Sequence, residues 1–201
     1  MTDYVIGYGS LLSGYSRRTY SGIQEGVLPV RAHGWRRGWT VRYPDEAATY
    51  AGVRTAPGHV LDAALVPTLI TPELKHRERG YVFTEVPRGT VEPARPGDRL
   101  PEGRFWIVVN REQVRADAEH PIPQSYVDTC LAGCLETGGD VLASAFIRHT
   151  ELWDAHWVDD RDAEQPLYPR LTPVDAQERA HIDALLEAAG VLRYRQPAGR
   201  Y

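Results

Sequence analysis

Glycine alternates with a tyrosine and a serine near the amino terminus, in Gly7, Tyr8, Gly9 and Ser10, directly after the β-forming residues 4–6. Glycine adopts backbone angles closed to other residues and lets a ligand approach the main chain. Amide groups in such a loop, with the Ser10 hydroxyl and the Tyr8 phenol, could hold an anion or a polarised carbonyl. An ordinary glycine turn explains the same residues, and no phosphate-loop lysine follows.

A carboxylate in the middle of the chain is the candidate acid or base. Glu78 lies in the run KHRER at 75–79. If this run is extended, side chains alternate, so Glu78 faces away from Arg77 and Arg79 and could point into a sheet. A base close to the two arginines would have a lowered pKa and accept protons poorly, so this role requires both arginines to face outward. The structural alternative is a solvated charge run.

Three segments together resemble one family. Tyr8 to Leu11, after an apolar strand, resembles the signature loop of the γ-glutamylcyclotransferase-like superfamily. Residues 74–81 (LKHRERGY) resemble its second landmark, an acidic residue shortly before a tyrosine-bearing strand. Residues 123–133 (PQSYVDTCLAG) resemble its helix entry, although the tyrosine here follows the serine at once. The resemblance covers most of the first two thirds of the chain and ends near Ala143.

The resemblance implies a fold, a reaction and a set of site residues. The implied fold is α+β, a small mixed β-barrel of about five to seven strands with flanking helices. We expect a single domain over residues 1–201, with a divergent carboxyl-terminal extension from about 143–201. The implied reaction is intramolecular aminolysis, in which a γ-glutamyl compound releases 5-oxoproline and an amine or amino acid. The implied catalytic residue is Glu78, ahead of Glu73 and Glu85, and the implied substrate-binding residues are Tyr8, Gly9, Ser10, Leu11, Tyr81 and Tyr126.

Composition narrows the class of protein. A chain of 201 residues can bury a substantial core in one domain. The net charge of -4 and the scattered positive residues do not favour nucleic-acid binding. No basic start with an apolar run marks a secretory signal, and no segment is expected to span a bilayer, so a cytoplasmic location is predicted. We expect neither cofactor nor metal, and the sequence does not indicate an oligomeric state.

Strand signals dominate the first half. Short β-forming runs between residues 27 and 66 are separated by glycines and prolines, as in a meandering or barrel-like sheet. Residues 33–39 (HGWRRGW) mix aromatics with arginines. Two arginines are too few for a nucleic-acid surface, so tryptophans that cap a small barrel are the preferred interpretation. Residues 105–109 (FWIVV) predict a buried strand after a proline- and glycine-rich loop at 87–103.

Two helices carry start and stop signals. Ser125 with Asp128 three residues later predicts a capped helix that ends at glycines 138–139 and carries Tyr126 in its first turn. Residues 172–190 predict a second helix, opened by a threonine, a proline and an aspartate and ended by a glycine.

Other functions compete with the γ-glutamyl interpretation. Cys130 and Cys134 lie on one face of the predicted helix, where core packing is favoured over a cysteine hydrolase or a zinc site. A non-catalytic member of the same fold that binds a small molecule or a protein is the main rival. Residues 153–170 contain His156, Asp159, Asp160 and Asp162, which could suggest a metal site. A solvated loop, or a wall that covers the pocket, is the preferred interpretation.

Overall fold

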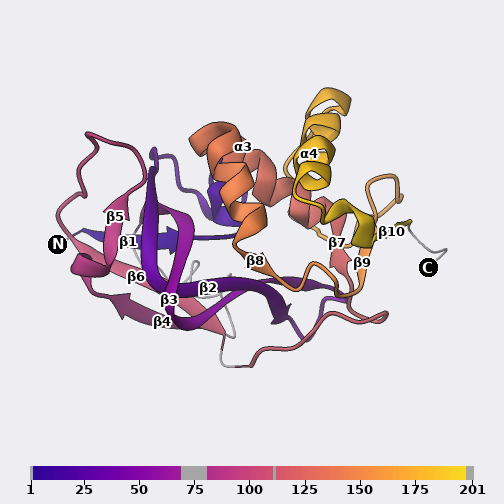
Figure 1. Cartoon of the computed structure of the whole chain (residues 1–201), viewed down its shortest axis with the longest axis horizontal. Coiled ribbons are helices and arrows are strands. Elements are labelled where there is room, and N and C mark those ends of the chain that lie inside the picture. The colour runs from indigo at the N-terminus through magenta and orange to yellow at the C-terminus, as the bar shows by residue number, and fades with distance from the viewer. Residues whose placement is uncertain (1, 69–80, 111, 198–201) are drawn as a thin grey trace.

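The computed structural model describes residues 2–68, 81–110 and 112–197. Its main sheet has the strand order β4-β6-β1-β3-β2-β5, with β8 paired to β2, and a smaller sheet has the order β10-β9-β7 (Figure 1). The strands of the main sheet are β1 (Asp3–Gly7), β2 (Leu28–Arg42), β3 (Thr49–Pro67), β4 (Tyr81–Val86), β5 (Val91–Pro93), β6 (Arg104–Asn110) and β8 (Thr150–Glu151). Those of the smaller sheet are β7 (Ile122–Pro123), β9 (Trp157–Asp159) and β10 (Arg195–Pro197).

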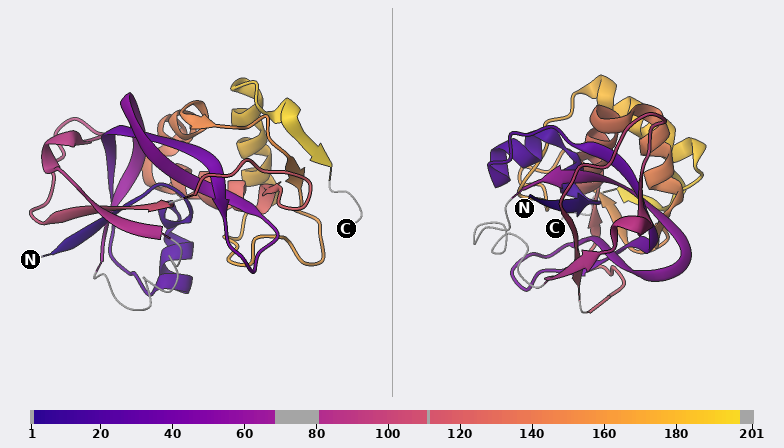
Figure 2. Two further views of the ribbon diagram at one scale, coloured as in Figure 1. Left: turned by 90° about the horizontal axis from the view of Figure 1, so that it is seen from below. Right: turned by 90° about the vertical axis from the view of Figure 1, so that its left-hand side faces the viewer.

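The helices lie beside the sheets. Figure 2 shows α4 and β10 at the end of the molecule opposite the amino terminus. The α-helices are α1 (Gly14–Ser21), α3 (Gln124–Arg148) and α4 (Ala176–Ala188), and the short 3-10 helices are η1 (Ser10–Leu12), η2 (Arg88–Thr90) and η3 (Leu192–Tyr194). Strand β1 runs parallel to β6 and antiparallel to β3, so the main sheet is mixed. The α+β class is therefore confirmed.

Closure into a barrel is not confirmed. In the part of the chain that the structure describes, β4 and β5 end the strand order of the main sheet and no pairing joins them. The core also continues beyond the sheet, because Ile182 and Leu186 of α4 belong to the same buried cluster as the strands. The single-domain boundaries and the extension from about residue 143 remain predictions.

Two long strands replace the short runs expected between residues 27 and 66. β2 and β3 have 15 and 19 residues and pair along most of their length. Register shifts in this pairing fall between His33 and Trp35 and between Trp39 and Val41. Gly34 has a φ of 84°, which only glycine adopts easily, so it forms an irregularity within β2 rather than ending the strand.

Both tryptophans and Arg37 of the 33–39 segment are buried, whereas His33 is exposed and Arg36 is half-buried. Trp39 is fully buried and packs edge-on against Trp153 and Tyr126, with ring centroids 4.9 and 6.0 Å apart. Arg37 is also fully buried, and its guanidinium lies 3.6 Å from the ring centroid of Phe146. Trp39 therefore joins β2 to the helical half of the molecule instead of capping a barrel.

Helix α3 matches its predicted stop but not its predicted cap. Its range begins at Gln124, with Pro123 at the N-cap, and runs to Arg148. Gly139 has non-helical angles, φ 62° and ψ -160°, so α3 consists of two helical segments joined by a kink, and the first segment ends at the glycines, as expected. The expected cap is wrong, because the Ser125 hydroxyl donates to Asp160, at 2.6 Å, instead of bonding within the helix.

Helix α3 also bears on the prediction that no segment spans a membrane. By length and composition alone, α3 is apolar enough to cross a bilayer, contrary to the sequence-based expectation. However, 56% of its most apolar 18-residue window is buried inside the protein, as in a core helix. A cytoplasmic location remains a prediction.

The second predicted helix is confirmed as α4. Asp175 is its N-cap and forms a capping box with Glu178, and Gly190 follows its end with a φ of 70°.

Candidate functional site

A pocket lies where β1 ends. The turn after β1 leads at Gly9 into η1, whose first bond joins the Leu12 amide to the Gly9 carbonyl at 2.9 Å. Tyr8, Gly9, Ser10, Leu11 and Tyr126 all line the pocket, which has a volume of about 40 Å³. The remaining lining residues are Ile6, Gly7, Tyr43, Tyr50, Ala51, Val108, Tyr168 and Arg170. Five of the residues implied by the resemblance are thus brought together, from the start of the chain and from α3.

The loop residue Tyr8 is held at both its side chain and its main chain. Its phenol donates to the Val108 carbonyl of β6 at 2.7 Å, so the phenolic hydrogen expected for a ligand is engaged by the protein. Its carbonyl accepts from Nη1 of Arg37 at 3.2 Å. In a trans peptide the carbonyl and the next amide point in opposite directions, so the Gly9 amide points away from Arg37.

Arg37 fixes this loop from inside the core. Besides Tyr8, its guanidinium donates to the main-chain carbonyls of Asp62 (3.0 Å) and Phe146 (3.2 Å) and to the Thr150 hydroxyl (2.8 Å). Burial lowers the pKa of Arg37, but an arginine remains charged in proteins. One buried cation therefore ties the pocket loop to β3, α3 and β8.

Close contact explains why residue 9 is a glycine. A Cβ at Gly9 would lie 2.6 Å from the phenolic oxygen of Tyr126. This separation is shorter than van der Waals contact allows, so only glycine fits between η1 and α3 without a shift. The sequence pattern identified the glycine, and the structure supplies the neighbour that requires it.

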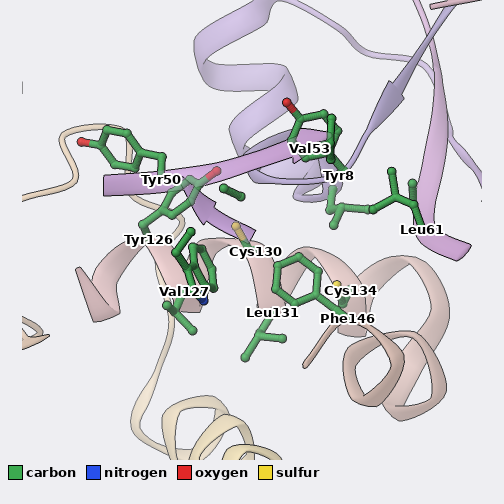
Figure 3. Close-up of a cluster of buried hydrophobic side chains, with 14 of the residues drawn as sticks. Tyr8, Tyr50, Val53, Leu61, Tyr126, Val127, Cys130, Leu131, Cys134 and Phe146 are labelled. Carbon is green, nitrogen blue, oxygen red and sulfur yellow. The ribbon is translucent and has the colours of Figure 1, made fainter. Parts of the chain in front are cut away.

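A cluster of tyrosines surrounds the pocket, and Figure 3 shows two of them, Tyr50 and Tyr126, side by side. Their ring centroids are 4.9 Å apart, and Tyr168 packs 4.8 Å from Tyr126. Burial raises the pKa of Tyr126, and burial together with a 2.5 Å hydrogen bond to Glu46 raises that of Tyr50. These phenols therefore stay protonated at neutral pH, as hydrogen-bond donors rather than bases.

One charged residue lines the pocket from the 153–170 segment. Arg170 forms an ion pair with Glu46 at 3.2 Å and lies over the Tyr168 ring, 5.2 Å from its centroid. No sequence pattern identified Tyr168, Arg170, Glu46 or Tyr50 as pocket residues. Tyr168 and Arg170 lie within the segment expected to cover the pocket, but single residues in an irregular loop carry no periodicity that would identify them.

Asp160, in the acidic part of the 153–170 segment, has a structural role. Asp160 is almost fully buried and accepts hydrogen bonds from the Ser125 amide (2.8 Å), the Ser125 hydroxyl (2.6 Å) and the Leu167 amide (2.8 Å). It thereby holds the start of α3, next to Tyr126, and the loop that leads to Tyr168. Within residues 2–68, 81–110 and 112–197, no three side chains of metal-ligating type are grouped for a metal ion.

Two implied site residues cannot be placed. Glu78 lies outside the described residues, as do Arg77 and Arg79. Tyr81 begins β4, where it pairs with Asn110 of β6, but its side chain is also outside the description.

The cysteines are core residues. Cys130 and Cys134 are free thiols, both buried on α3 among the apolar side chains drawn in Figure 3. Burial raises the pKa of Cys130 to about 12 and that of Cys134 further. A nucleophilic cysteine needs a thiolate, so this setting disfavours a cysteine hydrolase.

Comparison with solved structures places the fold. A structure titled gamma-glutamyl cyclotransferase matches with a TM-score of 0.54 at 13% identity, over 92% of this chain and 99% of that one. An uncharacterised protein from Homo sapiens matches with a TM-score of 0.53 at 13% identity, over 90% of this chain and 98% of that one. By sequence, no family model and no curated protein matches.

A third structural match is longer than this chain. YkqA from Bacillus subtilis matches with a TM-score of 0.53 at 18% identity over 74% of this chain, which spans about half (54%) of YkqA. The chain therefore shares the fold of the structure titled gamma-glutamyl cyclotransferase, as the sequence resemblance predicted.

Proposed function

We propose that this protein is a γ-glutamyl cyclotransferase-type enzyme that releases 5-oxoproline and an amine or amino acid from a γ-glutamyl compound. The supporting observation is that the loop Tyr8 to Leu11 and the helix residue Tyr126 line one pocket. The fold shared with a γ-glutamyl cyclotransferase structure supports the same reaction.

The reaction joins two groups of the same molecule. The α-amino nitrogen of the glutamyl unit loses a proton and attacks its own γ-carbonyl carbon, which forms the ring bond and an oxyanion. The bond to the leaving nitrogen then breaks, and that nitrogen receives a proton. Orientation of two reacting groups can contribute about 7–11 kcal/mol, so a pocket that folds the glutamyl chain supplies much of the catalysis without a covalent intermediate.

We assign the proton transfers to Glu78, as the base for the amine and the acid for the leaving nitrogen. Such transfers contribute about 10²–10⁴ in rate. Glu78 precedes Tyr81 by three residues, a span of at most about 11 Å. Tyr81 pairs with Asn110, two residues beyond the pocket residue Val108. Covalent distance is therefore compatible with a carboxylate at the pocket.

The glutamyl head also needs partners for its negative charges. We assign the developing oxyanion or the α-carboxylate to the main-chain amides of residues 9–11, where the Gly9 amide points away from Arg37. Loss of one oxyanion donor typically costs about 3 kcal/mol. Arg170, already paired with Glu46, is a second candidate for the carboxylate, because guanidinium groups bind carboxylates in a bidentate manner.

A panel of γ-glutamyl amino acids, γ-glutamylamines and glutathione tests the proposal through released 5-oxoproline. We expect at least one compound to be turned over and Glu78→Gln to lose about 10²-fold or more in rate. Glu85→Gln is the matched control, because Glu85 is exposed on β4, and it should retain activity. Full activity of Glu78→Gln would exclude the mechanism.

The rival, a binding protein of the same fold, makes a different prediction. Calorimetry would then detect binding of γ-glutamyl compounds, while no compound of the panel would yield 5-oxoproline.

A further inference from the structure

A second, larger cavity lies between β2, β3 and the carboxyl-terminal part of α3. Its volume is about 510 Å³, and its lining includes Arg31, Asp62, Arg95, Arg148 and His149. A neighbouring cavity of about 270 Å³ shares Arg148 and His149 with it. We call the two together the basic groove. Its lining residues differ from those of the pocket beside Tyr8.

Cations outnumber anions in the larger cavity of this groove. Three arginines line it, against the single carboxylate of Asp62. That carboxylate is already engaged, because it lies 2.6 Å from Nδ1 of His149 and only 9% of its side chain is exposed. The three arginines carry more charge than the single carboxylate of the lining, so the groove has a net positive charge and attracts anions.

The arginines differ in how firmly the protein holds them. Nη2 of Arg95 donates to the Thr137 carbonyl at 2.6 Å, which orients that guanidinium. Arg31 is half-exposed and has only long ion pairs, 3.9 Å to Asp62 and 3.7 Å to Glu92. Arg148 is exposed and forms no ion pair with any described residue. Arg31 and Arg148 are therefore available to a ligand.

The α3 side of the groove is apolar. Leu142 and Ala145 are buried there, and Val141 is 78% exposed, the highest value among the exposed large apolar side chains of the described residues. A single exposed valine is ordinary on a protein surface. Its position beside a cavity with an aliphatic wall and free guanidinium groups favours a ligand that is apolar at one end and anionic at the other.

We propose that the basic groove binds a small organic anion, a carboxylate or a phosphate monoester with an apolar body. Arg31 and Arg148 contact the anionic group, and Val141, Leu142 and Ala145 contact the body. This assignment is independent of the reaction proposed for the pocket beside Tyr8, because it rests on other residues.

The groove is also connected to that pocket. Nη1 of Arg37 donates both to the carbonyl of the groove residue Asp62 and to the carbonyl of Tyr8. Nε of the same guanidinium donates to Thr150, the neighbour of His149. A ligand that moves Asp62 or His149 therefore acts on a cation that positions the Tyr8–Gly9 peptide.

Isothermal titration calorimetry of the full chain tests the site with phenyl phosphate and phenylacetate as probes. Two comparison compounds are titrated in the same way: inorganic phosphate, which lacks the apolar body, and benzyl alcohol, which lacks the charge. We expect at least one charged aromatic probe to bind roughly tenfold more tightly than either comparison compound, and the tighter of the two identifies the headgroup. Failure of both charged aromatic probes to bind saturably would overturn the proposal.

Variants locate the bound probe. Arg148→Gln and Val141→Asp are both exposed positions, and each should weaken binding roughly tenfold. The exposed Arg99→Gln is the matched control and should bind like the wild type. If Arg170→Gln weakens binding and Arg148→Gln does not, the probe occupies the pocket beside Tyr8 and the proposal is wrong.

Nuclear magnetic resonance tests the connection without an activity assay. Saturation of the groove should shift the amide resonance of Gly9 in the wild type. An unchanged Gly9 resonance with the probe bound would overturn the connection through Arg37.

Discussion

Arg37 offers the sharpest test of how the pocket loop is held. Its guanidinium is fully buried and donates to four oxygens on four separate segments. In Arg37→Met, the carbonyls of Tyr8 and Asp62 lose this donor, whereas the Phe146 carbonyl keeps a 2.6 Å bond from Thr150. The methionine preserves most of the volume and the contact with Phe146, so the lost hydrogen bonds dominate the effect.

The magnitude follows from the two carbonyls. A buried acceptor left without its donor costs about 1–3 kcal/mol, so two of them lower the free energy of unfolding by about 2–6 kcal/mol. The result should lie in the lower half of this range, because the variant no longer buries a charge. Arg37→Lys keeps the charge, but a single ammonium cannot reach oxygens distributed around a planar guanidinium, so its loss should be intermediate.

Urea unfolding at neutral pH measures both variants. We expect a lower midpoint with an unchanged denaturant dependence, which indicates lost stability rather than a changed unfolded state. Arg99→Met is the surface control. An Arg37→Met protein within about 0.5 kcal/mol of the wild type, the range of surface substitutions, would refute the reasoning.

Three further predictions concern other parts of the site and its supports. Gly9→Ala should destabilise the protein by about 1–3 kcal/mol, because the added methyl group meets the Tyr126 hydroxyl. Adding Tyr126→Phe should recover most of that loss in thermal unfolding. No recovery would mean that the contact is not the cause. The hydrogen bond from Trp106, together with the nearby arginine of β6, lowers the pKa of Asp3. The stability that Asp3 contributes is therefore present above its ordinary pKa of 3.8, and it is lost as the pH falls through the lower pKa of the folded state. The unfolding free energies of wild type and Asp3→Asn should therefore differ by up to about 1 kcal/mol at neutral pH and converge at acidic pH, and a constant difference would contradict this. Because burial raises the pKa of Cys130 to about 12, iodoacetamide should leave it unmodified in the native protein and label it in urea, whereas rapid native labelling with loss of activity would support the cysteine hydrolase.

The opening loop was predictable because its signal is local. Glycine at residue 9 is required by a close approach, and a strand followed by a glycine turn marks where such an approach occurs. The start of α4 was equally predictable, because its N-cap Asp175 binds a main-chain amide only three residues away.

Other features depend on distant partners. Gly34 suggested a strand end, but the pairing of β2 with β3 continues around it. Ser125 and Asp128 have the spacing of a helix cap, yet Asp160 and Arg161 bind them instead. In each case a residue far along the chain competes with the local interaction, and the sequence pattern contains no sign of it.

The burial of Arg37 was similarly invisible. Arginine is rarely fully buried, so an aromatic and basic segment suggests a surface. Four oxygens on four segments make this position possible, and only the folded chain brings them together. Placement of Tyr168 and Arg170 at the pocket also depends on the loop that Asp160 anchors.

Alternating charges connect the last strand to the helix that carries Tyr126. Arg195 of β10 binds Asp183 of α4 at 2.8 Å, Asp183 binds Arg161 at 2.9 Å, and Arg161 binds Asp128 of α3 at 2.7 Å. Loss of Arg161 would leave Asp128 without its ion-pair partner in a largely buried setting. In native-state hydrogen exchange, the amides of α4 and of the smaller sheet should therefore open together as one cooperative unit, rather than fray inward from β10.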